Sequence, residues 1–86
     1  MYSVELSQLD DKFLNKLDKQ HSERIKERLK KLGEIPIPSD AKFMGRDLGE
    51  KVFRYRIGDY RALYKIKETE KVVLIAKIDK RPRIYD

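Results

Sequence analysis

The chain has 86 residues, of which 42% are charged and none is cysteine, and its formal net charge is +6. A chain of this length supports one hydrophobic core, so we expect a single domain over residues 1–86. The lack of cysteine excludes a disulfide framework and a zinc knuckle, and no apolar run approaches the roughly 20 residues of a membrane span. We therefore expect a soluble cytoplasmic protein with no membrane span, metal or other cofactor.

The positive charge is concentrated in the second half of the chain. Residues 1–50 contain 10 basic and 10 acidic side chains, whereas residues 51–86 contain 11 basic and 5 acidic ones. A basic region confined to one part of a small domain is typical of proteins that bind a polyanion. The pattern points to nucleic acid, an anionic membrane surface or an acidic protein segment as the partner.

The first 33 residues predict a short strand and a helical hairpin. Residues 1–6 alternate between apolar and polar side chains, which is typical of a strand. Ser7 is predicted to cap a first helix, and Ser22 is predicted to cap a second helix that ends at Gly33. Apolar residues recur at helical spacing along both segments: Leu9, Phe13, Leu14, Leu17, Ile25, Leu29 and Leu32.

The connections around the second helix are predicted to be irregular. His21 lies at the predicted break between the helices, where we expect a solvated loop residue and not a catalytic base. Pro36 and Pro38 exclude a further helix after Gly33. Residues 34–49 show little periodicity and are predicted to form a connecting loop.

The second half of the chain predicts three consecutive strands. Residues 51–57 and 60–67 alternate strictly, and Gly58 and Asp59 between them predict a tight turn. Residues 72–78 are almost continuously aliphatic, which is typical of a strand covered on both faces. The expected fold is α+β: an N-terminal strand, a helical hairpin and a three-stranded antiparallel meander, with the helices packed on one face of the sheet.

The alternation in these strands separates aromatic from basic side chains. Phe53, Tyr55, Tyr60 and Tyr64 are predicted to face the helices and form part of the core. The opposite face is then expected to carry Arg54, Arg56, Arg61, Lys65, Lys77 and Arg81. Arginine presents a planar fork of donors that suits phosphate, so this face is a candidate phosphate site. The same pattern is also typical of solvated charges that protect a hairpin from aggregation.

Two stretches of the second half resemble a known family. The run RYRIGDYRALYKI and the terminal IDKRPRIYD resemble the RelE and ParE toxins of bacterial and archaeal toxin–antitoxin pairs. These toxins share a G-x-YR-x-x-Y strand and a terminal element similar to R-x-x-x-Y. The resemblance extends over nearly the whole chain, because the order of elements, the length and the basic character agree as well.

The resemblance to the RelE branch implies a ribosome-dependent endoribonuclease that cleaves mRNA in the A site and leaves a 2′,3′-cyclic phosphate. Carried over residue by residue, the catalytic set falls on Arg54, Arg56, Arg61, Arg81 and Tyr85. Arg56 and Arg61 are expected to hold charge on the phosphate, Arg81 to assist the leaving oxygen, and Tyr85 to act as base or to stack on a nucleobase. Binding to RNA phosphates is expected for a second group: Lys65, Lys77, Lys80 and Arg83.

The resemblance also implies partners and leaves alternatives open. Its partners would be a cognate RelB-like antitoxin, in a hetero-oligomer, and the ribosome with its mRNA. Some relatives have lysine where this chain has Arg54 and Arg56, and arginine does not readily lose a proton, so the general base is unassigned. A ParE-like toxin that inhibits DNA gyrase without RNA cleavage is an alternative, as is a non-catalytic module that binds RNA or an acidic protein.

Overall fold

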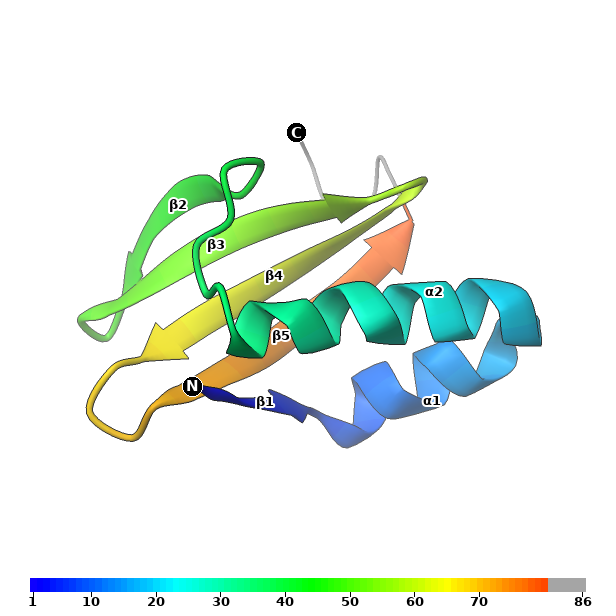
Figure 1. Cartoon of the computed structure of the whole chain (residues 1–86), viewed down its shortest axis with the longest axis horizontal. Helices are drawn as coiled ribbons and strands as arrows, with labels where there is room; N and C mark the ends of the chain where they lie inside the picture. The colour runs from blue at the N-terminus through cyan, green and yellow to red at the C-terminus, as the bar shows by residue number, and fades with distance from the viewer. Residues whose placement is uncertain (81–86) are drawn as a thin grey trace.

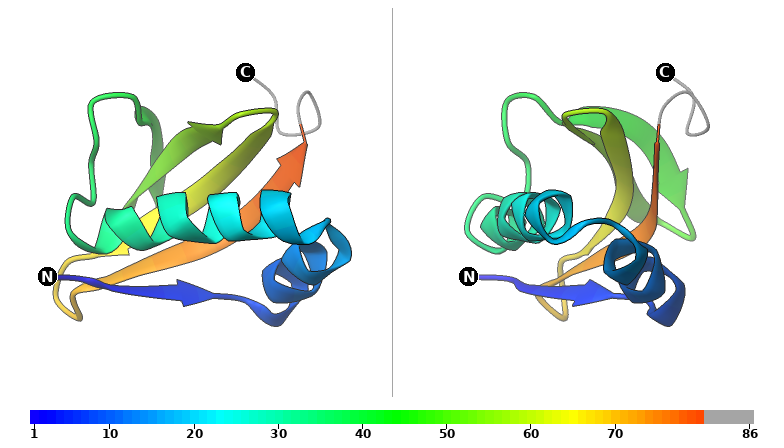
Figure 2. Two further views of the ribbon diagram at one scale, coloured as in Figure 1. Left: turned by 45° about the vertical axis from the view of Figure 1, so that its right-hand side comes forward. Right: turned by 90° about the vertical axis from the view of Figure 1, so that its right-hand side faces the viewer.

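The computed structural model describes residues 1–80, which form a five-stranded sheet with two helices on one of its faces (Figures 1 and 2). The strand order in the sheet is β1-β5-β4-β3-β2, and β1 is parallel to β5 whereas the other neighbours are antiparallel. The predicted α+β class is therefore confirmed. Within residues 1–80, none of the helices has the length and apolar character of a membrane span. The elements in chain order are β1 (Ser3–Leu6), α1 (Gln8–Lys16), α2 (Lys19–Lys30), the 3-10 helix η1 (Lys31–Gly33), β2 (Lys42–Asp47), β3 (Glu50–Ile57), β4 (Tyr60–Lys67) and β5 (Val72–Lys80).

Strand β2 is an element that the sequence did not predict. Residues 42–47 pair with β3, so the antiparallel part of the sheet has four strands where three were expected. The pairing register shifts between Phe43 and Gly45, and Gly45 has a φ of 117°. This irregularity interrupts the alternation of side chains within a short edge strand, so the local pattern does not reveal it.

Helix α2 begins earlier than predicted. Its N-cap is Asp18, whose Oδ1 accepts a hydrogen bond from the backbone N–H of His21 at 3.0 Å. The prediction that Ser22 is the cap was wrong, because Ser22 lies inside the helix and is buried. His21 is consequently helical and not a loop residue, although its side chain is exposed as expected.

The core lies between the helices and the inner face of the sheet. The predicted inward orientation of Phe53, Tyr55 and Tyr64 is confirmed, since each is at most 5% exposed, and Tyr60 packs against the same cluster. Tyr64 Oη donates a hydrogen bond to the carbonyl of Pro36 at 2.8 Å, which ties the loop before β2 to the sheet. Buried apolar residues make up the rest of this cluster: Leu14, Ile25, Leu29, Leu32, Ile57, Ala62, Ile66, Val73, Ile75 and Ile78.

The first turn of α1 presents a different residue to the sheet from the one expected. Leu9 was predicted to be on the apolar stripe, but its side chain is 79% exposed. The inward position is taken by Asp10, which is 5% exposed and lies four residues before the fully buried Leu14. The first residue of α1 that faces the sheet is therefore Asp10 and not Leu9.

Strand β5 is covered on one face only, contrary to the expectation of burial on both faces. Its buried and more exposed side chains alternate because the helices cover a single side of the sheet. Tyr64 pairs with Ile75 and Leu63 pairs with Lys77, so Ala76 is an extra residue in β5. The segment did not read as an alternating strand because the outward-facing Val72 and Leu74 are aliphatic as well, and because the bulge then shifts the alternation.

Candidate functional site

Basic side chains of β3, β4 and β5 share the face of the sheet that points away from the helices. Residues that lie directly opposite each other in antiparallel strands project from the same face. Arg56 is opposite Arg61, Arg54 is opposite Leu63, and Leu63 is opposite Lys77. We call this surface the cationic face and define it by Arg54, Arg56, Arg61, Lys65 and Lys77.

The end of the cationic face next to the β3–β4 turn combines an exposed and a buried arginine. The Arg61 side chain is 5% exposed. Arg56 is exposed, and its Nε donates a hydrogen bond to the carbonyl of Gly58 in the turn at 3.3 Å. Like charges placed directly opposite each other repel, and an anion that binds beside them reduces this repulsion. This end of the face is therefore suited to a phosphate group.

The two lysines of the cationic face have different surroundings. Lys65 Nζ forms an ion pair with the carboxylate of Asp47 on β2. The hydrogen bond to this carboxylate raises the pKa of Lys65 above its ordinary value. Lys77 is exposed on β5. Lys77 is thus placed to meet a ligand from solvent, whereas Lys65 also helps to hold β2 against the sheet.

Of the remaining predicted site residues, only Lys80 lies within residues 1–80. Lys80 is exposed and lies opposite Tyr60, which packs against the core, so its side chain projects from the helix side at the end of β5. Arg81, Arg83 and Tyr85 lie outside the described residues. The roles that the sequence predicts for these three residues stay predictions.

Two charged residues on the cationic face were missed by the sequence reasoning. Lys42 lies opposite Arg54 because β2 pairs with β3. Asp79 lies opposite Arg61 and accepts a hydrogen bond from the backbone N–H of Lys80 through Oδ1 at 2.8 Å. To place Lys42 on this face, the sequence reading would have to recognise β2 as a strand. To place Asp79 there, it would have to recognise the bulge in β5. Asp79 adds a carboxylate beside the arginines.

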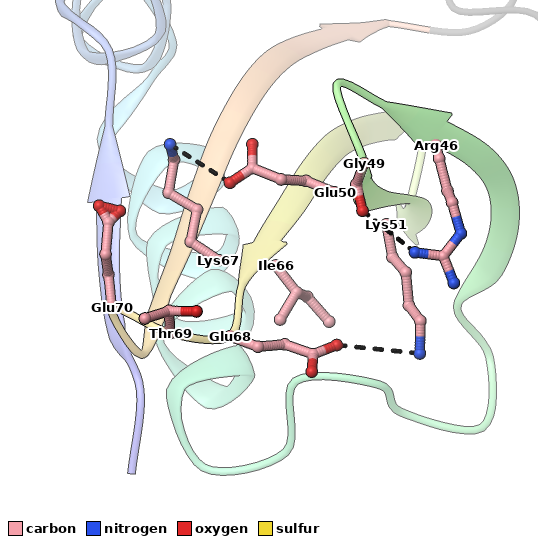
Figure 3. A pocket seen from close by; sticks show the side chains of 9 residues that line it. All are labelled: Arg46, Gly49, Glu50, Lys51, Ile66, Lys67, Glu68, Thr69 and Glu70. Carbon is pink, nitrogen blue, oxygen red and sulfur yellow. Dashed lines mark hydrogen bonds and ion pairs between the residues drawn. The ribbon is translucent and has the colours of Figure 1, made fainter.

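A hollow of about 490 Å³ lies at the other end of the sheet, between the β2–β3 and β4–β5 turns (Figure 3). Four of its charged side chains form two ion pairs: Lys67 Nζ is 3.5 Å from a Glu50 carboxylate oxygen, and Lys51 Nζ is 3.8 Å from a Glu68 carboxylate oxygen. Arg46 Nη1 donates to the carbonyl of Gly49 at 3.0 Å. These contacts stabilise the two turns, so we place no ligand here. Within residues 1–80, no three His, Cys, Asp or Glu side chains are grouped as a metal site requires.

The sequence matches the model of a known protein family. The model of the ParE toxin of type II toxin–antitoxin systems, parDE, matches residues 4–85. This match extends over nearly the whole chain. The protein belongs to this toxin family.

Solved structures of related toxins have the same fold. A chain of the archaeal RelE–RelB complex from Pyrococcus horikoshii is 30% identical to this toxin, with a TM-score of 0.84 over 95% of this chain and 97% of that chain. A chain of the toxin–antitoxin complex RelBE2 from Mycobacterium tuberculosis is 28% identical, with a TM-score of 0.76 over 93% and 98%. The predicted membership of the RelE/ParE superfamily, in its RelE branch, is confirmed.

A more distant structure agrees in fold. The isolated RelE toxin of E. coli is 23% identical, with a TM-score of 0.72 over 99% of this toxin and 92% of that chain. At this level of identity the similarity concerns the fold alone. A search of curated protein sequences finds no significant match to the toxin.

Proposed function

We propose that this toxin is a ribosome-dependent endoribonuclease of the RelE type, which cleaves mRNA in the ribosomal A site through attack by the 2′-hydroxyl group. The observation that carries the proposal is the position of Arg56 directly opposite Arg61, with Arg54 and Lys77 on the same face. Fixed guanidinium groups suit RNA phosphate because they bind its oxygens through two parallel hydrogen bonds. The similarity to RelE proteins supports the same reading.

The reaction needs three charge movements that the proposed site can serve. The 2′-oxygen bonds to the neighbouring phosphorus as the bond from phosphorus to the 5′-oxygen breaks, which leaves a 2′,3′-cyclic phosphate. The 2′-hydroxyl proton passes to a base, and the departing 5′-oxygen gains a proton. Arg56 and Arg61 would stabilise the charge that builds up on the phosphate oxygens, and Arg81 would assist the departing oxygen.

Arginine is poorly suited to be the base that accepts the 2′-hydroxyl proton. Arginine does not readily give up its proton, so Arg54 and Arg56 are poorly suited to accept another one. Asp79 is a carboxylate on the same face and lies directly opposite Arg61. We therefore assign Asp79 as the candidate general base among the described residues, and Tyr85 as the second candidate.

The proposal includes a protein partner. The similar chains from P. horikoshii and M. tuberculosis come from toxin–antitoxin complexes. By analogy, this toxin would bind a RelB-like antitoxin whose acidic side chains complement its net charge of +6. Its target, the ribosome with bound mRNA, would place its action in the cytoplasm.

The direct test uses purified toxin and ribosomes stalled with a defined codon in the A site. We expect cleavage within that codon, detected by primer extension, and a 2′,3′-cyclic phosphate on the upstream product. The same mRNA without ribosomes is the control and should stay intact. Intact mRNA on the ribosome at equimolar toxin would contradict the proposal.

Inhibition of DNA gyrase is the second candidate function, because the matching family model describes a ParE toxin. The discriminating measurement is a supercoiling assay with purified gyrase and the same toxin preparation. Gyrase-dependent DNA breaks, together with intact mRNA on ribosomes, would favour this function over RNA cleavage.

A further inference from the structure

Asp10 is a buried acidic residue at the contact between α1 and β5. Its side chain is 5% exposed, although it belongs to the first turn of a surface helix. The neighbouring Leu9 is 79% exposed, so the helix turns a carboxylate and not a leucine toward the sheet. A buried carboxylate is costly unless hydrogen bonds satisfy it. The contacts of Asp10 therefore need a specific explanation.

The Asp10 carboxylate joins the start of α1 to the end of β5. Its Oδ1 accepts a hydrogen bond from the backbone N–H of Ile78 at 3.1 Å, across 68 positions of sequence. Its Oδ2 accepts a hydrogen bond from Ser7 Oγ at 2.8 Å. Ser7 is the N-cap of α1, and its Oγ also accepts from the backbone N–H of Asp10 at 3.1 Å. The helix cap and the strand are thus linked through one side chain.

The hydrogen bond between Asp10 and the Ile78 amide lies beyond the point at which β1 stops pairing with β5. Strand β1 pairs only Ser3–Leu6 with residues 72–75 of β5, after which the chain leaves the sheet at Ser7. Among the described residues, no strand borders the later part of β5 on that side. A backbone N–H on a strand edge without a pairing partner needs another acceptor when it is buried. Asp10 binds the Ile78 amide within this open stretch.

The same stretch follows the bulge that sets which side chains of β5 face the cationic face. Because Ala76 is extra, Lys77 is opposite Leu63 and Ile78 is opposite Ala62 in the core. With continuous pairing and no bulge, Lys77 would lie opposite Ala62 and project into the core. A shift by one residue reverses the direction of every later side chain. The bulged register therefore decides the position of Asp79 as well.

We propose that Asp10 is a positioning residue. Its hydrogen bond to the Ile78 amide holds the end of β5 in the bulged register, and this register keeps Lys77 and Asp79 on the cationic face. The expected effect on RNA cleavage rests on the proposed function, whereas the effect on the strand register does not. A general contribution to folding is the alternative explanation, and the tests below separate the two.

The first test measures amide hydrogen exchange by NMR in three variants. Asp10→Ala should speed exchange of the Ile78 amide by about tenfold or more, while amides of β3 stay unchanged. Asp10→Asn should behave like the wild type, because the amide oxygen of asparagine accepts the same bond. Asp11→Ala is the matched control, since Asp11 is exposed in the same first turn. It removes an equivalent charge without a contact to β5.

The second test measures single-turnover cleavage and ribosome binding separately. Asp10→Ala should reduce the cleavage rate by about 10-fold to 100-fold and leave ribosome binding within about threefold, because small displacements of reacting groups affect chemistry most. Asp10→Asn and Asp11→Ala should cleave at close to the wild-type rate. Ser7→Ala, which removes one donor to the carboxylate, should show the same pattern in weaker form if Asp10→Ala does not fold.

Three results would overturn the proposal. Equal loss of cleavage in Asp10→Ala and Asp10→Asn would show that the hydrogen bond to Ile78 is not the cause. Faster exchange throughout the sheet would indicate general destabilisation, and fast exchange at Ile78 with unchanged cleavage would remove the link to the site. If the wild type does not cleave mRNA, the proposed function fails. The claim about the strand register is then decided by NMR alone. Changes in exchange that are confined to residues 76–80 and their β4 partners support it, and the absence of such changes overturns it.

Discussion

Arg56 on β3 and Arg61 on β4 lie directly opposite each other, in the second residue pair from the two-residue turn that joins their strands. Arg61 is 5% exposed, whereas Arg56 is exposed and its Nε contacts the carbonyl of Gly58. The buried guanidinium is held by its surroundings, and the exposed one can turn toward a ligand. This arrangement makes Arg56 the safer residue for testing catalysis, because its removal leaves the core intact.

Arg56→Ala should lower the single-turnover rate of mRNA cleavage by about 100-fold to 1,000-fold, as expected when a donor to a developing oxyanion is lost. The matched control is Arg46→Ala, because Arg46 also donates to a carbonyl in a neighbouring turn, that of Gly49, but at the other end of the sheet. The control should cleave within about threefold of the wild type. Similar rates for both variants would show that Arg56 takes no part in the reaction.

Asp79→Asn should reduce cleavage by about 100-fold to 10,000-fold if Asp79 accepts the 2′-hydroxyl proton, because an amide cannot take up a proton at neutral pH. Asp59→Asn serves as the control, since Asp59 is an exposed acid in the adjacent turn. Normal cleavage by Asp79→Asn, combined with loss in Tyr85→Phe, would assign the base to Tyr85.

Gly33→Ala should destabilise the toxin through a clash of backbone with side chain. A Cβ atom at position 33 would lie 2.7 Å from the carbonyl oxygen of Tyr2, and the Gly33 carbonyl accepts a hydrogen bond from the Tyr2 N–H at 2.8 Å. Relief of the clash would strain this contact, so we expect a loss of about 1–3 kcal/mol in the free energy of unfolding. Urea denaturation measures it, with the exposed neighbour Glu34→Ala as control. Equal midpoints for the two variants would refute the clash.

The ion pair between Lys65 and Asp47 should stabilise the toxin in a manner that depends on pH. Because Asp47 raises the pKa of Lys65 above 10.5, the pair contributes fully at pH values below the pKa of the unfolded chain. The contribution disappears as the pH rises through the raised pKa of the folded state. Asp47→Asn should therefore melt at a lower temperature than the wild type near about pH 8, and this difference should shrink above about pH 11. A difference that stays constant over this range would contradict the assignment.

Elements with an uninterrupted local period were predictable from the sequence. The apolar residues Ile25, Leu29 and Leu32 recur at helical spacing, and all three are buried against the sheet. The strict alternation of residues 51–57 and 60–67 set the β3–β4 hairpin, and with it the placement of Arg54, Arg56 and Arg61 on one face. In both cases the residue spacing of one helix or one strand determines which side chains face the core and which face solvent.

The errors occur where a contact between distant segments overrides the local pattern. Strand β2 exists because it pairs with β3, and its irregular register hides the alternation that would have shown Lys42 beside Arg54. Local sequence places Asp10 in the first turn of a helix, where acidic residues are favoured, but does not reveal its hydrogen bond to the distant Ile78 amide or its burial.

The sequence by itself determined that this toxin has a helical hairpin, an alternating strand hairpin and arginines on one face of it, because each of these depends on neighbours along the chain. Only the tertiary structure decided that Asp79 shares this face with Arg61 and that Asp10 holds the strand which carries it. The physical reason is that a bulge and a hydrogen bond across the fold set the register of β5, and register is a property of paired segments.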